Sequence, residues 1–227
     1  PKPSSAASDV YKRQLVIFTE PHAKEFFAEK SELIEEPKRI SPWRDKFERL
    51  KTQDVEFAFY LKFNAKLQSM TPEDFIEIVL NNLNIKQLTI GDDFKFGYQR
   101  KGDYEMLCDW GKTNQIVVEK TPTFSKDNRR CSSSWIREAL SKDDFELAAD
   151  LLGRRYTYSG KVVNGNSLGR TIGVPTANLW LPKSNLPIKG VYAVRVKFEA
   201  ESYQGIANMG IRPTIGGENP VLSLIHI

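Results

Sequence analysis

The sequence predicts an α/β domain followed by a smaller all-β domain. Between residues 15 and 152, short apolar runs alternate with amphipathic segments, which is typical of strands and crossover helices around a mostly parallel sheet. From there on, glycine and proline separate short segments of period-two alternation, as in residues 194–198. A chain of 227 residues is long enough for two such cores. We therefore expect the domain boundary near Gly153.

Apolar runs and helix-start signals define the elements of the first domain. Its strands are expected at residues 15–18, 55–61, 87–91 and 115–119. Ser41 and Thr71 each precede a proline, which predicts two helix starts because the hydroxyl caps free N–H groups and proline suits the first helical position. The second of these helices has one apolar face, formed by Phe75, Ile76, Val79, Leu80 and Leu83. Another helix is expected over residues 143–152.

The composition favours a cytoplasmic protein that handles small anionic molecules. Its 33 basic and 29 acidic residues give a net charge of +4 without a dense basic block, which disfavours a nucleic-acid partner. Cys108 and Cys131 lie far apart and outside any metal-ligand spacing, so neither a disulfide framework nor a zinc site is expected. No apolar run approaches the roughly 20 residues that cross a bilayer, so we expect no membrane association.

Both ends of the chain differ in character from the rest. Residues 1–14 are a small-polar stretch that joins abruptly onto the apolar run at Leu15, and residues 223–227 read SLIHI. Both resemble translated sequencing-adapter sequence, and we expect non-native tails outside the fold. The alternative is a loose start and a short last strand.

Two segments of the first domain are candidate binding sites. Ser132, Ser133 and Ser134 precede a helical pattern with Arg137 one turn in, which predicts an ATP-phosphate site because a helix N-terminus attracts anions. The alternative is that the serines only cap the helix. The second segment is the glycine-containing loop 91–103, which follows a predicted strand.

The aromatic residues of this loop allow two interpretations. At the carboxyl end of a parallel strand, Phe94 and Phe96 can pack on a planar ligand ring. Alternatively, the loop lies on the surface and both rings are buried in the core.

The second domain contains the strongest local signal, residues 160–179. Glycines such as Gly165 let the backbone approach a ligand, Arg170 can bind phosphate, and Thr176 and Asn178 offer oxygens on one face of a strand. Such hard oxygens suit Mg²⁺ bound to ATP. The Gly-Lys-Ser/Thr ending of a Walker loop is absent. The alternative is a glycine hairpin followed by a turn at Pro175.

Several stretches together resemble one family. The first domain is similar to the adenylyltransferase module of bacterial FAD synthetases in LVIFTEPHAKEFF, PWRDKFERL, GDDFKFGYQRKGD and SSSWIREAL. This resemblance implies a nucleotidyltransferase-type doubly wound parallel sheet. It also implies that Ser132, Ser133, Ser134 and Arg137 form an ATP-phosphate motif, with Ser134 replacing the usual threonine. The residues it implies for the flavin pocket are Asp93, Phe94, Phe96 and Gly97.

The second domain resembles riboflavin kinases in GNSLGRTIGVPTANL, GVYAVRV and GIANMGIRPTIGG. The resemblance implies a six-stranded β-barrel that transfers the γ-phosphoryl group of ATP to riboflavin. It implies that Mg-ATP is held by Gly165, Arg170, Thr176 and Asn178, with Thr176 and Asn178 nearest the metal. The chain is thus identified as a member of the bacterial bifunctional riboflavin kinase/FMN adenylyltransferases. Their reactions involve Mg²⁺, ATP, riboflavin, FMN and FAD.

The chain departs from this family at two places. The family's Gly-x-Phe-Asp-x-x-His-x-Gly-His motif is missing, since the only histidines are His22 and His226. Ser223 stands where the family continues into a strand bearing a catalytic glutamate. We therefore expect an adenylyltransferase domain over 15–152 and a kinase domain over 153–222, both truncated and incomplete. No catalytic residue is assigned, and activity should fall by orders of magnitude.

Two other functions are compatible with the sequence. One is a non-catalytic module that binds flavin or nucleotide without chemistry. The other is nucleic-acid binding at Asn128–Arg130, which the weak overall basic charge disfavours. The oligomeric state is open, and a homo-oligomer is compatible with the sequence.

Overall fold

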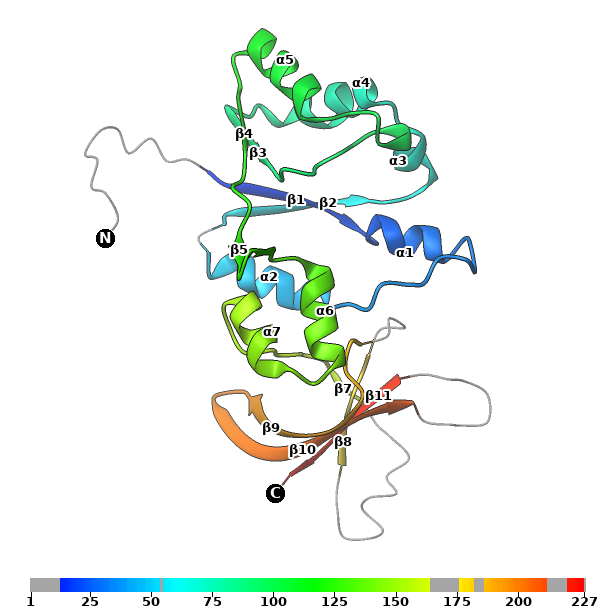
Figure 1. Cartoon of the computed structure of the whole chain (residues 1–227), viewed down its shortest axis with the longest axis vertical. Helices are drawn as coiled ribbons and strands as arrows, with labels where there is room; N and C mark the ends of the chain where they lie inside the picture. Colours follow the sequence, from blue (N-terminus) through cyan, green and yellow to red (C-terminus); the bar gives the residue numbers. More distant parts are fainter. Residues whose placement is uncertain (1–12, 54, 164–175, 182–185, 212–219, 227) are drawn as a thin grey trace, which may run out of the picture. The chain divides into compact units, whose positions relative to one another are not determined.

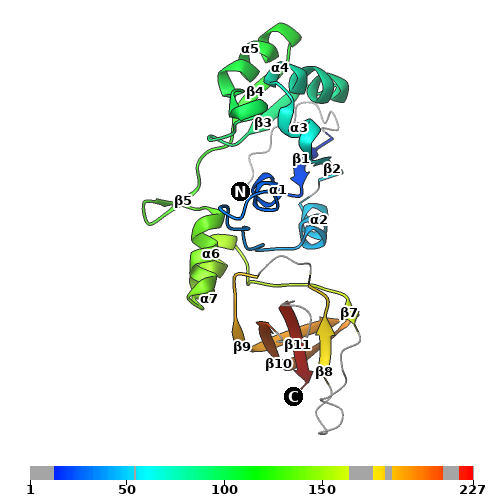
Figure 2. The same ribbon diagram turned by 90° about the vertical axis from the view of Figure 1, so that its right-hand side faces the viewer.

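The structure is a computed structural model that describes residues 13–53, 55–163, 176–181, 186–211 and 220–226 (Figures 1 and 2). It divides into two compact units. Unit 1 comprises residues 1–15, 35–58 and 132–227, and unit 2 comprises residues 16–34 and 59–131. Residues 35–58 and 132–152 thus belong to the same compact unit as the C-terminal sheet.

The strands of unit 2 form near the predicted positions. β1 (Leu15–Glu20) pairs with β2 (Phe57–Lys62), and β3 (Gln87–Ile90) pairs in parallel with β4 (Val117–Lys120). The N–H of Phe57 donates to the carbonyl of Gln14 and that of Phe63 to the carbonyl of Glu20. Because both bonds have the same sequence offset, β1 and β2 also run in the same direction. A short hairpin of β5 (Ser125–Lys126) and β6 (Arg129–Arg130) follows β4.

One helical segment of unit 2 confirms the predicted start at Thr71. α4 (Pro72–Phe75) begins where the Thr71 hydroxyl accepts from the Asp74 N–H at 3.1 Å, and it continues as a π-helix and a 3₁₀ turn to Leu83. The predicted apolar face packs against β3 and α5 (Tyr104–Asn114). The buried core of unit 2 is Ile76, Val79, Leu80, Ile90, Phe96 and Leu107. The unit also contains α1 (Ala23–Ala28), α3 (Ala65–Ser69) and a 3₁₀ turn at Tyr98–Arg100.

Within the described residues, three helices belong to unit 1. α2 (Trp43–Lys51) follows Pro42, which occupies the N-cap position, so the predicted capping role of Ser41 is wrong. α6 (Ser133–Ser141) and α7 (Phe145–Leu152) form where the sequence predicts them. The Asp144 carboxylate accepts from the Leu147 N–H at 3.0 Å, and Gly153 ends α7 with a φ of 65°.

Helix α2 is attached to the chain segment that follows α7. Asp45 of α2 is buried and accepts hydrogen bonds from the N–H and the hydroxyl of Ser159. The Arg49 guanidinium donates to the Thr157 hydroxyl at 2.7 Å. A buried carboxylate is tolerated only with such partners, so these contacts explain why α2 groups with unit 1.

The C-terminal part of unit 1 is a five-stranded antiparallel sheet with the strand order β7-β8-β11-β10-β9. Its strands are β7 (Val162–Val163), β8 (Thr176–Leu179), β9 (Gly190–Phe198), β10 (Glu201–Ile211) and β11 (Pro220–His226). Among the described residues the sheet is not closed. Residues 223–226, for which the sequence predicts a tail outside the fold, are part of the central strand β11. Their non-native origin stays a prediction.

Alternation along these strands gives the sheet two different faces. Met209, Leu222 and Leu179 lie opposite one another in one cross-strand row, and Ala207, Leu224 and Ala177 lie in the next row on the same face. This face packs against α6 and α7. The buried residues of the shared core are Ala139, Leu140, Ala148, Leu181, Leu186, Ile188, Ala207, Met209 and Leu222. The residues in between point to the other face.

Truncation of Leu140 tests this core. Its side chain is 0% exposed, so we expect Leu140→Ala to lower the free energy of unfolding by about 2–5 kcal/mol through lost burial and a cavity. Val191→Ala is the control, because Val191 is 66% exposed and the expected change is below about 0.5 kcal/mol. Urea unfolding of both variants measures the difference, and equal effects would contradict the assignment of this core.

The Tyr158 hydroxyl makes stability depend on alkaline pH. Burial, with a smaller contribution from the Asp45 charge, raises the pKa of Tyr158 from 10 to about 12. Its contribution to stability is complete below pH 10 and is lost as the pH rises towards 12, because the unfolded chain releases this proton first. Tyr158→Phe should therefore unfold with a smaller loss of stability than the unchanged chain over this window. Parallel urea titrations between pH 9 and 12 measure this, and identical pH dependence would contradict it.

Candidate functional site

The serine cluster of the first candidate site lies at the N-terminus of α6. The Trp135 N–H donates to the Ser132 hydroxyl at 3.2 Å, so Ser132 is the N-cap residue. Ser133 and Ser134 follow in the first turn and are exposed. The capping interpretation is thus confirmed for Ser132. Ser133 and Ser134 are therefore exposed side chains at a helix N-terminus, which is the end of a helix that attracts anions.

Arg137 is held one turn further into α6. Its Nε donates to the carbonyl of Lys38 at 2.6 Å. The contact joins α6 to the segment before α2, within unit 1. The predicted phosphate contact of Arg137 stays a prediction.

The two phenylalanines of the loop after β3 have different environments. Phe96 is 6% exposed in the core of unit 2, whereas Phe94 is 37% exposed. Their rings stack with centroids 5.8 Å apart and an interplanar angle of 19°. Phe96 and Gly102 exchange backbone hydrogen bonds of 2.9 and 3.1 Å, which close the loop. Phe96 therefore anchors the loop, and Phe94 is the ring that a planar ligand can reach.

Gly97 is required by the packing of this loop. It has a φ of 72°, and a Cβ at this position would lie 2.6 Å from the Pro72 nitrogen. A larger residue would push the loop away from the start of α4. The predicted pocket residue Gly97 thus has a clear backbone role.

Asp93 in the same loop lies beside Asp92 and Arg130. Arg130 lies 2.8 Å from the Asp92 carboxylate and 3.2 Å from that of Asp93. The Thr123 hydroxyl donates to Asp92, and this bond, followed by the Arg130 charge, lowers the pKa of Asp92. From the sequence, Arg130 is only a member of a possible basic patch. Its partners Asp92 and Asp93 lie far from it in the chain, so no local pattern predicts these ion pairs.

The second candidate site is on the face of the C-terminal sheet opposite the core. Thr176 and Asn178 of β8 point to this face, which confirms the predicted common orientation. Asn178 is 6% exposed, and its Oδ1 accepts from the Ser223 hydroxyl at 2.7 Å. Gly165 and Arg170 lie outside the described residues.

Ser223 and Asn208 lie in the same cross-strand row as Asn178, and local sequence patterns do not identify them as its neighbours. Ser223 lies opposite Asn178 on one side and opposite Asn208 of β10 on the other. The signal that places them is the register between three strands. That register cannot be deduced from local patterns, because the strands are separated by long connections.

The donor set at this face fits a magnesium ion that is also bound by phosphate. The Thr176 hydroxyl and the Asn178 amide both offer neutral oxygens, and the Asn178 amide oxygen accepts from Ser223. Magnesium commonly takes few protein ligands together with phosphate oxygens and water. Across the described parts of the chain, acidic, cysteine and histidine residues do not gather in threes as a closed protein metal cage would require.

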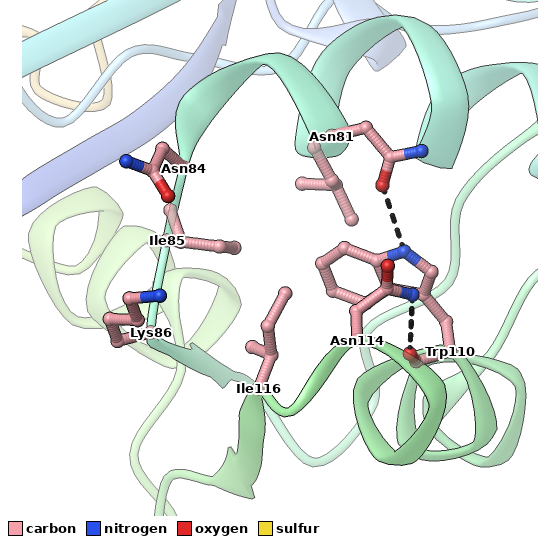
Figure 3. A pocket seen from close by; sticks show the side chains of 8 residues that line it. Asn81, Asn84, Ile85, Lys86, Trp110, Asn114 and Ile116 are labelled. Carbon is pink, nitrogen blue, oxygen red and sulfur yellow. Dashed lines mark hydrogen bonds between the residues drawn. The ribbon is translucent and has the colours of Figure 1, made fainter.

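A separate cavity of about 230 Å³ lies at the opposite end of β3 and β4 from the Phe94 loop (Figure 3). Trp110 Nε1 donates to Asn81 Oδ1 at 2.9 Å, and Asn114 Nδ2 donates to the Trp110 carbonyl at 2.8 Å. Its lining residues are Leu80, Asn81, Asn84, Ile85, Lys86, Trp110, Asn114 and Ile116. The predicted site residues are not among them. Ligands of open α/β sheets bind at the other, carboxyl end of the strands.

The helices in the described part of the chain are too short or too polar to span a membrane.

Comparison with known proteins identifies the family. Residues 4–135 match the family described as FAD synthetase, and residues 152–227 match that described as riboflavin kinase. The chain is 44% identical over 214 residues to a bifunctional riboflavin kinase/FMN adenylyltransferase of Haemophilus influenzae, covering 93% of this chain and 68% of the relative. It is 38% identical over 205 residues to the enzyme of the same name from Escherichia coli K12, covering 89% of this chain and 64% of the relative.

The fold is also similar to a solved structure. The crystal structure named as a macrolide-efflux protein from Streptococcus pneumoniae superposes with a TM-score of 0.72 at 28% identity, covering 95% of this chain and 69% of that one. The chain spans about two thirds of the length of the relatives it matches. It has the two-domain FAD synthetase/riboflavin kinase architecture of mixed helix and sheet. The chain therefore belongs to the bifunctional riboflavin kinase/FMN adenylyltransferases, a family of flavin cofactor biosynthesis.

Proposed function

We propose that this chain binds ATP and flavins at two sites, one for phosphorylation of riboflavin to FMN and one for adenylylation of FMN to FAD. The observation that carries the proposal is the common face of Thr176 and Asn178, turned away from the core and joined there by Ser223. Two oxygen ligands fixed on one rigid strand suit the metal-bound triphosphate of ATP.

At the kinase site, Thr176 and Asn178 hold the magnesium ion of Mg-ATP, and Gly165 and Arg170 contribute to the phosphate contacts. When bound, magnesium neutralises charge on the phosphate groups. The 5′-hydroxyl of riboflavin attacks the γ-phosphorus and loses its proton, and ADP leaves. The residues act chiefly by positioning, since phosphoryl transfer needs little covalent help from the protein.

Ser223 is an orienting residue of this site and is not suited to act as its general base. It lies beside Asn178 and donates to it, so its hydroxyl is an orienting group for the amide. A serine hydroxyl is a poor proton acceptor near neutral pH. A general base contributes about 10² to 10⁴ to such a rate, and Ser223 does not supply this contribution. The non-catalytic binding module is therefore the second candidate function.

At the adenylyltransferase site, Ser133, Ser134 and Arg137 bind ATP phosphates while Ser132 caps α6, and the exposed ring of Phe94 stacks on the flavin. Asp93, Phe96 and Gly97 shape the loop that carries this ring. His22 is engaged as the cap of α1, where its Nδ1 accepts from the Lys24 N–H at 3.2 Å. We therefore give it no role in the transfer of the nucleotidyl group.

The finer architecture belongs to the same proposal. The parallel β3–β4 pair supports a doubly wound sheet, and the five antiparallel strands support a six-stranded kinase barrel beyond a boundary near Gly153. Cys108 and Cys131 are free thiols, which supports a reducing compartment such as the cytoplasm. Flavins and ATP are the proposed partners, without nucleic acid.

Removal of the Thr176 hydroxyl tests the kinase site. We expect Thr176→Ala to reduce the magnesium-dependent part of ATP affinity by about tenfold, roughly 1.4 kcal/mol, because one metal ligand is lost. Calorimetric titration with ATP in the presence and absence of Mg²⁺ measures this part. Thr113→Ala, which removes an exposed hydroxyl of α5, is the control and should match the unchanged chain. Equal magnesium dependence in both variants would refute the metal site.

The two loop phenylalanines should respond differently to truncation. Phe94→Ala should weaken FMN binding by about 0.5–1.5 kcal/mol, the value of an aromatic pair, while stability changes little. Phe96→Ala should instead lower the free energy of unfolding by about 3–5 kcal/mol. Flavin fluorescence quenching and urea unfolding separate the two effects. FMN binding that is indifferent to Phe94 would exclude this ring from the flavin site.

A further inference from the structure

One cross-strand row of the five-stranded sheet is polar over three neighbouring strands. Asn178 of β8 lies opposite Ser223 of β11, which lies opposite Asn208 of β10. Directly opposite residues of antiparallel strands point to the same face. The three side chains therefore form a continuous row on the face that also carries Thr176. We call it the polar row.

The polar row changes from buried to exposed along its length. Asn178 is buried, Ser223 is half-buried and Asn208 is exposed. The Asn208 amide makes no side-chain hydrogen bond within the portion of the chain that the structure describes. A Cβ built on Gly210 would lie 3.7 Å from Asn208 Oδ1, so the amide leans towards a residue without a side chain. Space beside the amide is thus left for another molecule.

The row ends on an apolar side chain. Val191 of β9 lies opposite Asn208 and is 66% exposed. Neighbouring strands are about 4.8 Å apart, so Asn178 and Asn208 are separated by roughly 10 Å, and Val191 follows about 5 Å further. From β8 to β9, this face offers oxygens for metal and phosphate, then an amide, then an apolar surface.

We propose that Asn208 binds the ribityl chain of the flavin substrate and thereby determines specificity for flavins that carry it. The inference rests on the proposed kinase function of Thr176 and Asn178. The reacting 5′-hydroxyl must lie near these two residues, and the hydroxyl-bearing chain separates it from the apolar ring. The order of chemical groups in riboflavin thus matches the order of side chains along the polar row. An amide both donates and accepts, as a chain of hydroxyls requires.

A comparison of two flavins tests this role. Lumiflavin has the riboflavin ring with a methyl group in place of the ribityl chain. We expect Asn208→Ala to weaken riboflavin binding roughly three- to tenfold, the loss of about one hydrogen bond, and to leave lumiflavin binding unchanged. Fluorescence titration of both flavins with Mg-ADP present measures the two affinities. Flavin binding at the Phe94 loop is the same in the unchanged chain and in Asn208→Ala, so it does not affect the comparison of their affinities.

Gln204→Ala is the matched control, because it removes an exposed amide from the same face of β10. It should leave both affinities unchanged. If Asn208→Ala weakens the binding of riboflavin and of lumiflavin equally, or changes neither affinity, the ribityl role of Asn208 is overturned while the proposed function stands. If the unchanged chain binds no riboflavin, the proposed function fails first and this inference fails with it.

Discussion

The burial of one face of the C-terminal sheet against α6 and α7 is the constraint on which unit 1 depends. Because side chains alternate along a strand, burying Ala207, Met209 and Leu222 forces Thr176, Asn178 and Ser223 onto the opposite face. A register slip of one residue would exchange the two faces and bury polar groups without partners. The hydrophobic core therefore sets the position of the proposed metal ligands, although none of them belongs to it.

The same core holds a second motif in place. Ala139 and Leu140 bury one side of α6 against the sheet, while the N-terminus of that helix presents Ser133 and Ser134. In both motifs, the residues of the proposed binding site lie on a helix or strand whose position is fixed by the packing of other side chains. Such preorganisation reduces the ordering cost of binding.

Periodicity and capping signals in the sequence predict most helices and strands. They do not predict contacts between segments that are distant in the chain. The sequence predicts β3, α4 and α6 because their apolar spacing and start signals are local. It does not separate Phe94 from Phe96, because only the three-dimensional loop shows which ring lies in the core. Likewise, the row from Asn178 to Asn208 depends on long-range strand register. The predicted cap at Ser41 fails because Pro42 takes the N-cap position.

The central claim is that one face of the C-terminal sheet binds Mg-ATP while the other forms the core. Methyl NMR spectroscopy of the chain during titration with Mg-ATP tests it most directly. Ile206 and Ile225 share the face of Thr176, whereas Met209 and Leu222 point to the core. Mg-ATP should shift the methyl resonances of Ile206 and Ile225 and leave those of Met209 and Leu222 in place. Shifts confined to the two core residues would contradict the account.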